Sequence, residues 1–149
     1  MELKSLLVDS KTTWAEFPGL DGFEVELANL SRKELVNLRK NCTESKFNRK
    51  TRMFEESLND EKFVKDFTEA TVKGWKGLKL KYLEDLILVD LSGQDPESVM
   101  DYSDENAQVL VENSTEFDNW LNEVVFDLDN FRTKEPAKTV KKAKPVSGQ

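Results

Sequence analysis

A long row of apolar residues at helical spacing near the C-terminus, an amphipathic stripe, constrains the possible folds of this chain more than any other feature. Polar residues such as Asp118 and Asn122 lie opposite it. Burying seven apolar side chains contributes about 10–20 kcal/mol, whereas ordering about 17 residues costs about 17–34 kcal/mol in backbone freedom. The helix predicted over 117–131 therefore needs a surface to cover it, which is either the protein's own core or a partner. The stripe consists of Phe117, Trp120, Leu121, Val124, Val125, Leu128 and Phe131, at helical spacing.

The first thirty residues have the pattern of antiparallel strands. Thr12–Phe17 is rich in β-branched and aromatic residues, and a turn over 18–22 contains Pro and Gly. Apolar and acidic residues then alternate over Phe23–Leu27, which predicts a hairpin with one buried face. Leu3–Val8 is expected to add a third strand. Because a two-stranded hairpin is marginal by itself, its apolar face is expected to lie on helices.

Three more helices are predicted from N-terminal capping signals. Ser31 and Glu34 form a capping box, and Asn59 and Ser103 each precede two acidic residues. Residues 44–58 are poorly patterned, and we expect them to be partly helical.

Glycines and an ambiguous apolar run occupy the middle of the chain. Gly74 and Gly77 frame Trp75 and are expected to end the helix that starts at Asn59, or to turn it sharply. Residues 80–91 fit either a helix or a strand, and 92–96 read as a loop.

The predicted architecture is therefore α+β. A β-hairpin or small antiparallel sheet at the N-terminus packs on a mainly helical body of four to five helices. Residues 1–131 form a single domain, and residues 132–149, which lack apolar periodicity, form a disordered basic tail.

The composition argues against most catalytic chemistry. The chain has no His and one Cys, Cys42, which disfavours most metal sites, Ser-His-Asp or Cys-His catalysis and disulfide scaffolds. The densest acidic clusters, within 84–90 and 101–105, do not have calcium-loop spacing and are interpreted as solvated or helix-capping groups. We expect no enzyme activity, no cofactor and no bound metal.

Charge is unevenly distributed. Residues 132–149 hold six basic residues and one acid, which leaves 16 basic and 28 acidic residues in 1–131, a net charge of −12. An acidic body repels nucleic acid and anionic membranes, so neither is an expected partner. The chain has no apolar run of 18 residues and no signal-like N-terminus, which favours a reduced cytosolic setting.

A small basic patch stands out against this acidity. Four basic residues lie within 46–52, close in the sequence to Phe47 and Phe54. Stacking and charge make single-stranded nucleic acid one alternative. The acidic body favours another, in which the patch is complementary to the chain's own acids or to another acidic protein. The four residues are Lys46, Arg49, Lys50 and Arg52.

The order of short motifs resembles a known family. An aromatic hairpin with Trp14 and Phe17 is followed by a capped Leu-rich helix, then by the segment V-K-G-W-K-G-L over 72–78. Y-S-D-E-N over 102–106 and a final helix ending in N-F at 130–131 come next. Over about 12–131, the sequence is similar to the tail assembly chaperones of long non-contractile-tailed (siphovirus-type) bacteriophages.

The resemblance implies a role in viral assembly. Such proteins bind and solubilise the tape measure protein and promote polymerisation of the major tail protein around it. They act in the host cell cytoplasm as late proteins and are absent from the mature virion. Many also occur in a longer form made by ribosomal frameshifting, and Lys141-Lys142 is compatible with a slippery codon run.

Partner binding requires an apolar surface on a charged exterior. We expect five residues to contribute to a groove for the tape measure protein or to a surface for self-association, with ordinary core as the alternative for each. One other function is a structural tail-completion or adaptor subunit retained in the virion. Another is a small nucleic-acid-binding regulator. The five residues are Trp75, Leu78, Phe117, Trp120 and Val124.

Overall fold

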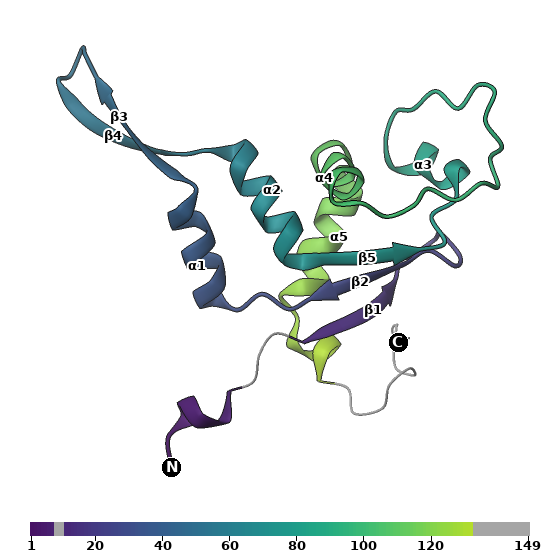
Figure 1. Ribbon diagram of the computed structural model, residues 1–149, viewed down its shortest axis with the longest axis horizontal. Helices are drawn as coiled ribbons and strands as arrows, with labels where there is room; N and C mark the ends of the chain where they lie inside the picture. The colour runs from purple at the N-terminus through teal and green to yellow at the C-terminus, as the bar shows by residue number, and fades with distance from the viewer. Residues whose placement is uncertain (8–10, 133–149) are drawn as a thin grey trace.

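Three antiparallel strands form the central sheet of the protein. The computed structural model describes residues 1–7 and 11–132. The strands are β1 (Thr12–Glu16), β2 (Glu24–Ala28) and β5 (Val72–Lys76), in the order β1-β2-β5 (Figure 1). Together with five α-helices and a separate two-stranded sheet in the described part of the chain, they confirm the predicted α+β class.

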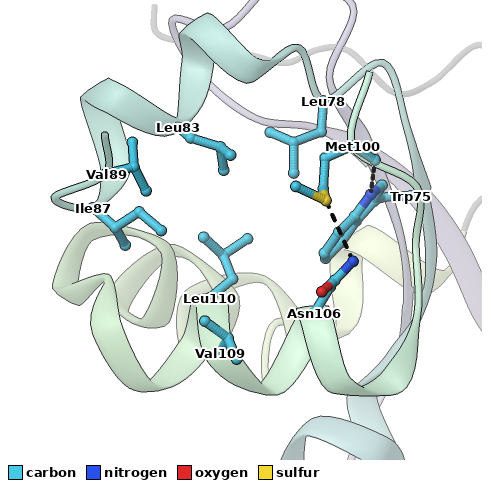
Figure 2. A pocket seen from close by; sticks show the side chains of 9 residues that line it. All are labelled: Trp75, Leu78, Leu83, Ile87, Val89, Met100, Asn106, Val109 and Leu110. Carbon is cyan, nitrogen blue, oxygen red and sulfur yellow. Dashed lines mark hydrogen bonds between the residues drawn. The ribbon is translucent and has the colours of Figure 1, made fainter. Parts of the chain in front are cut away.

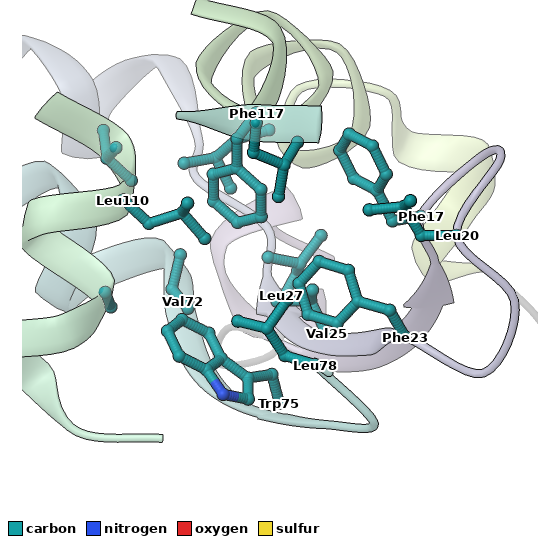
Figure 3. Packing of buried hydrophobic residues seen from close by; sticks show 14 of the residues in the cluster. Phe17, Leu20, Phe23, Val25, Leu27, Val72, Trp75, Leu78, Leu110 and Phe117 are labelled. Carbon is teal, nitrogen blue, oxygen red and sulfur yellow. The ribbon is translucent and has the colours of Figure 1, made fainter. Parts of the chain in front are cut away.

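The predicted N-terminal hairpin is confirmed, with the expected buried face. Thr13 pairs with Leu27 and Ala15 with Val25. Phe23, Val25 and Leu27 are completely buried, whereas Glu24 and Glu26 are partly exposed on the other face. The alternation seen in the sequence therefore sets which face of β2 meets the core (Figure 3).

The predicted third strand over Leu3–Val8 is wrong for the described residues Leu3–Leu7, and Val8 lies outside them. Leu3–Leu6 forms a 3₁₀ helix, η1, and the backbone N–H and Oγ of Ser5 both donate to the carbonyl oxygen of Glu2. This local turn satisfies the backbone without a neighbouring strand. Leu3, Leu6 and Leu7 are 75%, 60% and 71% exposed, so their apolar pattern does not reflect a buried face.

Capping signals located the helix starts correctly. α1 (Arg32–Asn41) begins at the predicted capping box, in which Glu34 N–H donates to Ser31 Oγ at 3.1 Å and Ser31 N–H donates to the Glu34 carboxylate at 2.9 Å. α2 (Asp60–Thr71) and α4 (Asp104–Asn113) begin after the predicted N-caps Asn59 and Ser103.

The prediction of partial helix over 44–58 is wrong. These residues form the antiparallel hairpin of β3 (Thr43–Asn48) and β4 (Met53–Leu58), which projects from the body (Figure 1). Every residue of the two strands is exposed except the half-buried Asn48. A hairpin without a buried face leaves no period in its hydrophobicity, which explains the lack of a clear sequence pattern.

The middle of the chain resolves into a strand and a short helix. The helix from Asn59 ends at Thr71, and Gly74 lies inside β5, so the expectation that Gly74 ends the helix is wrong. Gly77, with φ +75°, turns the chain toward α3 (Leu80–Leu86). The ambiguous segment is thus a helix in its first part and an irregular loop after Leu86.

The C-terminal helix is shorter than predicted. α5 (Thr115–Val125) stops at Val125, and a 3₁₀ turn, η2 (Leu128–Phe131), follows. Asp127 caps η2 by accepting from Asp129 N–H at 3.0 Å, and Asn130 Nδ2 donates to the Val124 carbonyl at 3.1 Å. These local bonds to Asx side chains compete with continuation of the helix.

The protein's own sheet covers much of the amphipathic stripe. Phe117, Leu121 and Val125 are completely buried, and Phe117 stacks on Phe17 with ring centroids 5.9 Å apart. Figure 3 shows Phe117 within the cluster of sheet side chains. One continuous buried cluster contains residues from Phe17 to Phe131. The predicted tail boundary at 132 falls at the end of the described residues, and 133–149 lie outside them.

The described residues contain no helix that is both long enough and apolar enough to cross a membrane.

Candidate functional site

A cavity of about 190 Å³ lies between the end of β5, α3, the loop after α3 and α4 (Figure 2). It opens to the surface beside Val89 and Val109, which are 37% and 49% exposed. Its floor is formed by fully or nearly buried residues such as Leu78 and Leu110. The lining residues are Trp75, Leu78, Leu83, Ile87, Val89, Met100, Asn106, Val109 and Leu110.

Backbone pairing holds two distant segments at the floor of this cavity. Met100 N–H donates to the Leu78 carbonyl at 2.7 Å, and Leu80 N–H donates to the Ser98 carbonyl at 2.8 Å. The turn at Gly77 makes this pairing reachable, because the residue has positive φ and touches the backbone of Gly22. These backbone hydrogen bonds hold the loop after α3 across the end of the sheet.

Trp75 joins the sheet to the start of α4. Its Nε1–H donates to the carbonyl oxygen of Met100 at 2.9 Å, and its ring meets Tyr102 edge-on at 5.2 Å. Asn106 Nδ2 donates to Met100 Sδ at 3.3 Å and to the Asp101 carbonyl at 3.1 Å (Figure 2). The segments 72–78 and 102–106, which carry the family resemblance, therefore meet at one place.

Tyr102 has a structural role beside the cavity. Its hydroxyl lies 3.1 Å from the Val72 carbonyl and 2.9 Å from an Asp104 carboxylate oxygen. Burial, reinforced by the hydrogen bond to Asp104, raises the pKa of Tyr102 to about 12. The phenol is therefore neutral at physiological pH and fixes the start of α4 to β5.

The cavity wall is suited to apolar contact. Among the described residues that line it, none is Asp, Glu, Lys, Arg or Cys, and Trp75 Nε1 and Asn106 Nδ2 are already hydrogen-bonded. Such a wall offers an apolar side chain dispersion contacts and removal from water. No group of three or more His, Cys, Asp or Glu among the described residues is placed to hold a metal ion.

The five residues predicted for partner binding do not form one groove. Trp75 and Leu78 line the cavity, although Trp75 is only 8% exposed and Leu78 is completely buried. Phe117 is completely buried in the core. Trp120 and Val124 are half-buried on α5, where Trp120 meets Phe17 edge-on at 4.9 Å. Leu78 is therefore part of the cavity floor, whereas Phe117 belongs to the hydrophobic core.

Sequence reasoning missed most of the cavity wall. The helical spacing of Leu83 and Ile87, and of Val109 and Leu110 after Ser103, marked buried helix faces. Met100 carried no periodic signal, because it lies in an irregular loop. The pairing of Met100 with Leu78 across the loop brings these residues together.

Two acidic residues between α3 and α4 have local structural roles: Asp90, from the cluster within 84–90, and Glu97, which lies outside both predicted clusters. Asp90 accepts from Ser92 N–H at 2.9 Å and from Ser92 Oγ at 2.6 Å, and these bonds lower the pKa of its carboxyl. Glu97 bridges Lys79 and Lys81 at 3.0 and 2.8 Å, and the hydrogen bonds to Lys81 and Lys79 lower its pKa. Both interactions help to shape the loop between α3 and α4.

A second titratable cluster lies away from the cavity, between α1 and α2. The buried Cys42 Sγ donates to Asp66 Oδ2 at 3.5 Å, and Lys62 Nζ lies 2.8 Å from the same oxygen. Burial, followed by the bond to Asp66, raises the pKa of the Cys42 thiol, which disfavours the reactive thiolate. This cluster ties the two helices together.

No family model, curated protein or solved structure matches this chain.

Proposed function

We propose that this protein is a phage tail assembly chaperone that binds and solubilises the tape measure protein and promotes polymerisation of the major tail protein around it. In this proposal it acts by apolar contact in the host cell cytoplasm and is not retained in the mature virion. It breaks no covalent bond and uses no cofactor.

The observation that carries the proposal is the convergence of two motifs on one apolar cavity. Trp75 and Leu78 come from the W-K-G-L segment, and Tyr102 and Asn106 come from the Y-S-D-E-N segment. Motifs that merely stabilised separate elements would not need to meet. Their convergence supports a shared role in forming a binding surface.

Charge around the cavity supports a holding function. Residues 82–131 contain 14 acidic residues and no basic residue. A holdase must cover an aggregation-prone apolar segment while its own exterior keeps the complex in solution. An apolar opening at Val89 and Val109, with the exposed carboxylates of Asp90 and Glu112 close to these residues in the chain, meets both needs.

The test is co-expression with the tape measure protein of the same phage. We expect the soluble fraction of the tape measure protein to rise with the wild-type protein and to fall with Val109→Glu, which places a charge at the cavity opening. Val36→Glu is the matched control, because Val36 and Val109 are 50% and 49% exposed on helices. Equal solubilisation by both variants would remove the cavity from the binding site.

Trp120 and Val124 require a separate variant because they lie outside the cavity lining. Trp120→Ala, compared with wild type at matched folded content by circular dichroism, tests the α5 part of the predicted surface. A loss of tape measure binding in Trp120→Ala but not in Val109→Glu would move the site to α5.

A structural tail-completion or adaptor subunit remains the second candidate function, since a small protein-binding domain also suits an assembled particle. Mass spectrometry of purified virions separates the two. A chaperone is expected to be missing, and stoichiometric recovery of the chain from virions would favour the retained subunit.

A further inference from the structure

The β3–β4 hairpin forms an arm, residues 43–58, that is not explained by the proposed function. Its large apolar side chains are open to solvent: Phe47, Met53 and Phe54 are 52%, 64% and 73% exposed. Phe47 and Phe54 are directly paired across the strands, with ring centroids 5.3 Å apart. The arm thus presents an aromatic pair near its far end.

Local hydrogen bonds stabilise the turn at the tip of the arm. Asn48 Oδ1 accepts from Lys50 N–H at 2.8 Å and from Thr51 N–H at 3.2 Å, and Asn48 Nδ2 donates to Glu55 at 3.1 Å. Arg52, at φ 59°, closes the turn through a 2.7 Å bond to the Asn48 carbonyl. These bonds hold the aromatic pair in a defined position, which lowers the entropy cost of binding.

An uncovered two-stranded hairpin is marginal in water and becomes stable when another surface packs on it. The tip also carries a distinctive charge: residues 46–52 contain four basic residues and no acid. A surface that covers this arm should therefore combine an apolar recess with negative charge.

The cavity beside Trp75 has both properties. Its volume is about 190 Å³, and an apolar cavity of about 150 Å³ is known to accommodate a benzene ring. Asp90 follows Val89 at its opening, and Glu112 lies one helical turn after Val109; both carboxylates are exposed. Seven of its nine lining residues, including Val89 and Val109 at the opening, lie in the segment 82–131, which carries no basic residue; Trp75 and Leu78 come from the preceding segment, 72–81, which contains four lysines.

The arm lies at one end of the molecule, and α3 and the loop after it, which contribute to the cavity wall, lie at the other (Figure 1). The arm leaves the body beyond α1 and α2, whereas α3 and its following loop stand at the other end of the sheet. The tip therefore cannot reach the cavity of its own chain, and a contact between them joins two copies.

We propose that the aromatic tip of the arm of one copy docks in the cavity of a second copy. A Phe ring enters between Val89 and Val109, and the basic tip residues lie against the surrounding carboxylates. The contact is head-to-tail, so an open chain of copies keeps one free arm at one end and one free cavity at the other unless it closes into a ring. The arm would occupy the same cavity that we propose for the tape measure protein, so the two would compete for it; self-association is therefore tested with the protein alone.

The first test is the mass of the purified full-length chain by sedimentation velocity at increasing concentration. We expect wild type to exceed its 17.2 kDa monomer mass. Phe47→Ala/Phe54→Ala and Val109→Glu should each remain monomeric, while the matched control Val36→Glu should associate like wild type. Because the arm and Val109 are exposed, circular dichroism should show wild-type folding in all variants. A wild-type monomer up to about 1 mM would overturn the proposal, because the contact would then be worth less than about 4 kcal/mol.

The decisive test mixes the two monomeric variants. Phe47→Ala/Phe54→Ala keeps a working cavity and Val109→Glu keeps a working arm, so an equimolar mixture should form a one-to-one dimer and nothing larger. A mixture that stays monomeric, or single variants that still associate, would overturn the proposal.

Charge variants separate the arm from the basic C-terminal segment. Arg49→Gln/Lys50→Gln should weaken association and its dependence on salt, whereas Arg32→Gln/Lys33→Gln, with the same charge loss on α1, should not. If Lys141→Gln/Lys142→Gln abolishes association while Arg49→Gln/Lys50→Gln leaves it intact, the occupant of the cavity is the C-terminal segment, and the arm proposal fails.

Discussion

The indole Nε1–H of Trp75 donates a hydrogen bond to the carbonyl oxygen of Met100 at 2.9 Å, across 25 positions of the chain. This bond connects the edge strand β5 to the loop that leads into α4. Trp75 and Met100 both line the cavity, so the bond also joins two parts of its wall. It acts together with the backbone hydrogen bond from Met100 N–H to the Leu78 carbonyl.

Trp75→Phe is expected to lower the free energy of unfolding by about 1–3 kcal/mol, since it leaves the Met100 carbonyl without this partner and shrinks a buried ring. Urea denaturation followed by far-ultraviolet circular dichroism measures the change. Trp14→Phe is the control, because Trp14 is 39% exposed, and we expect it to stay within about 0.5 kcal/mol of wild type. Equal effects of the two substitutions would contradict the role of the hydrogen bond.

Gly77→Ala is expected to destabilise the protein far more than Gly93→Ala. Both glycines have positive φ, +75° and +78°, so both substitutions incur the backbone cost of about 1 kcal/mol. A Cβ at position 77 would also overlap the carbonyl oxygen of Gly22, whereas at position 93 it would meet no atom within 4 Å. Comparing the thermal unfolding of the two variants isolates the steric contribution to the destabilisation by Gly77→Ala. Equal melting temperatures would show that the backbone at Gly22 and Gly77 can move apart without loss of stability.

Local sequence signals correctly predicted those parts of the fold that depend on interactions between residues close in the chain. The capping box at Ser31 and Glu34 set the start of α1, and the alternation over Phe23–Leu27 set the buried face of β2. Each signal involves neighbours in the sequence, so the sequence alone contains what is needed to read it.

The arm and the cavity could not be predicted in the same way. The arm has no buried face, so its strands leave no period, and the pairing of Phe47 with Phe54 depends on the turn at Asn48. The cavity depends on a loop whose Met100 pairs with Leu78, a contact that no periodicity encodes. Trp75 and Leu78 entered the predicted site as large apolar residues suited to partner contact, and the same reasoning also included the core residue Phe117.

Stability is expected to fall at alkaline pH through Tyr102. Its pKa is raised to about 12 from an ordinary value of 10.0, so the unfolded chain loses the proton first. Between these values the folded state binds more protons, and the free energy of unfolding therefore decreases as pH rises. Tyr102→Phe should remove this contribution to the pH dependence, at a cost of about 1 kcal/mol at neutral pH from the lost hydrogen bonds.

The Tyr102 titration can be observed directly. The chain has two tyrosines, so in Tyr82→Phe the tyrosinate absorbance reports Tyr102 alone. We expect its midpoint near pH 12 while the protein stays folded. A midpoint near 10 in the folded protein would show that burial does not disfavour the phenolate.

Acid is expected to loosen the junction of α1 and α2 through Asp66. The hydrogen bond from Lys62 at 2.8 Å, the largest cause, lowers the pKa of the Asp66 carboxyl, and Cys42 adds a second hydrogen bond. A carboxyl with a depressed folded pKa stabilises the fold above its unfolded pKa, and this contribution is lost as pH falls through the folded value. Asp66→Asn should therefore lower the free energy of unfolding at pH 7, by about 1 kcal/mol or less because the pair with Lys62 is partly exposed. It should also make the loss of stability below about pH 4 less steep. Glu69→Gln is the control on the same helix, where the Lys65–Glu69 atoms are 3.8 Å apart. The measurement is denaturation at a series of pH values from 7 downward. If the free energy of unfolding falls equally steeply with pH in Asp66→Asn and wild type, the prediction is contradicted.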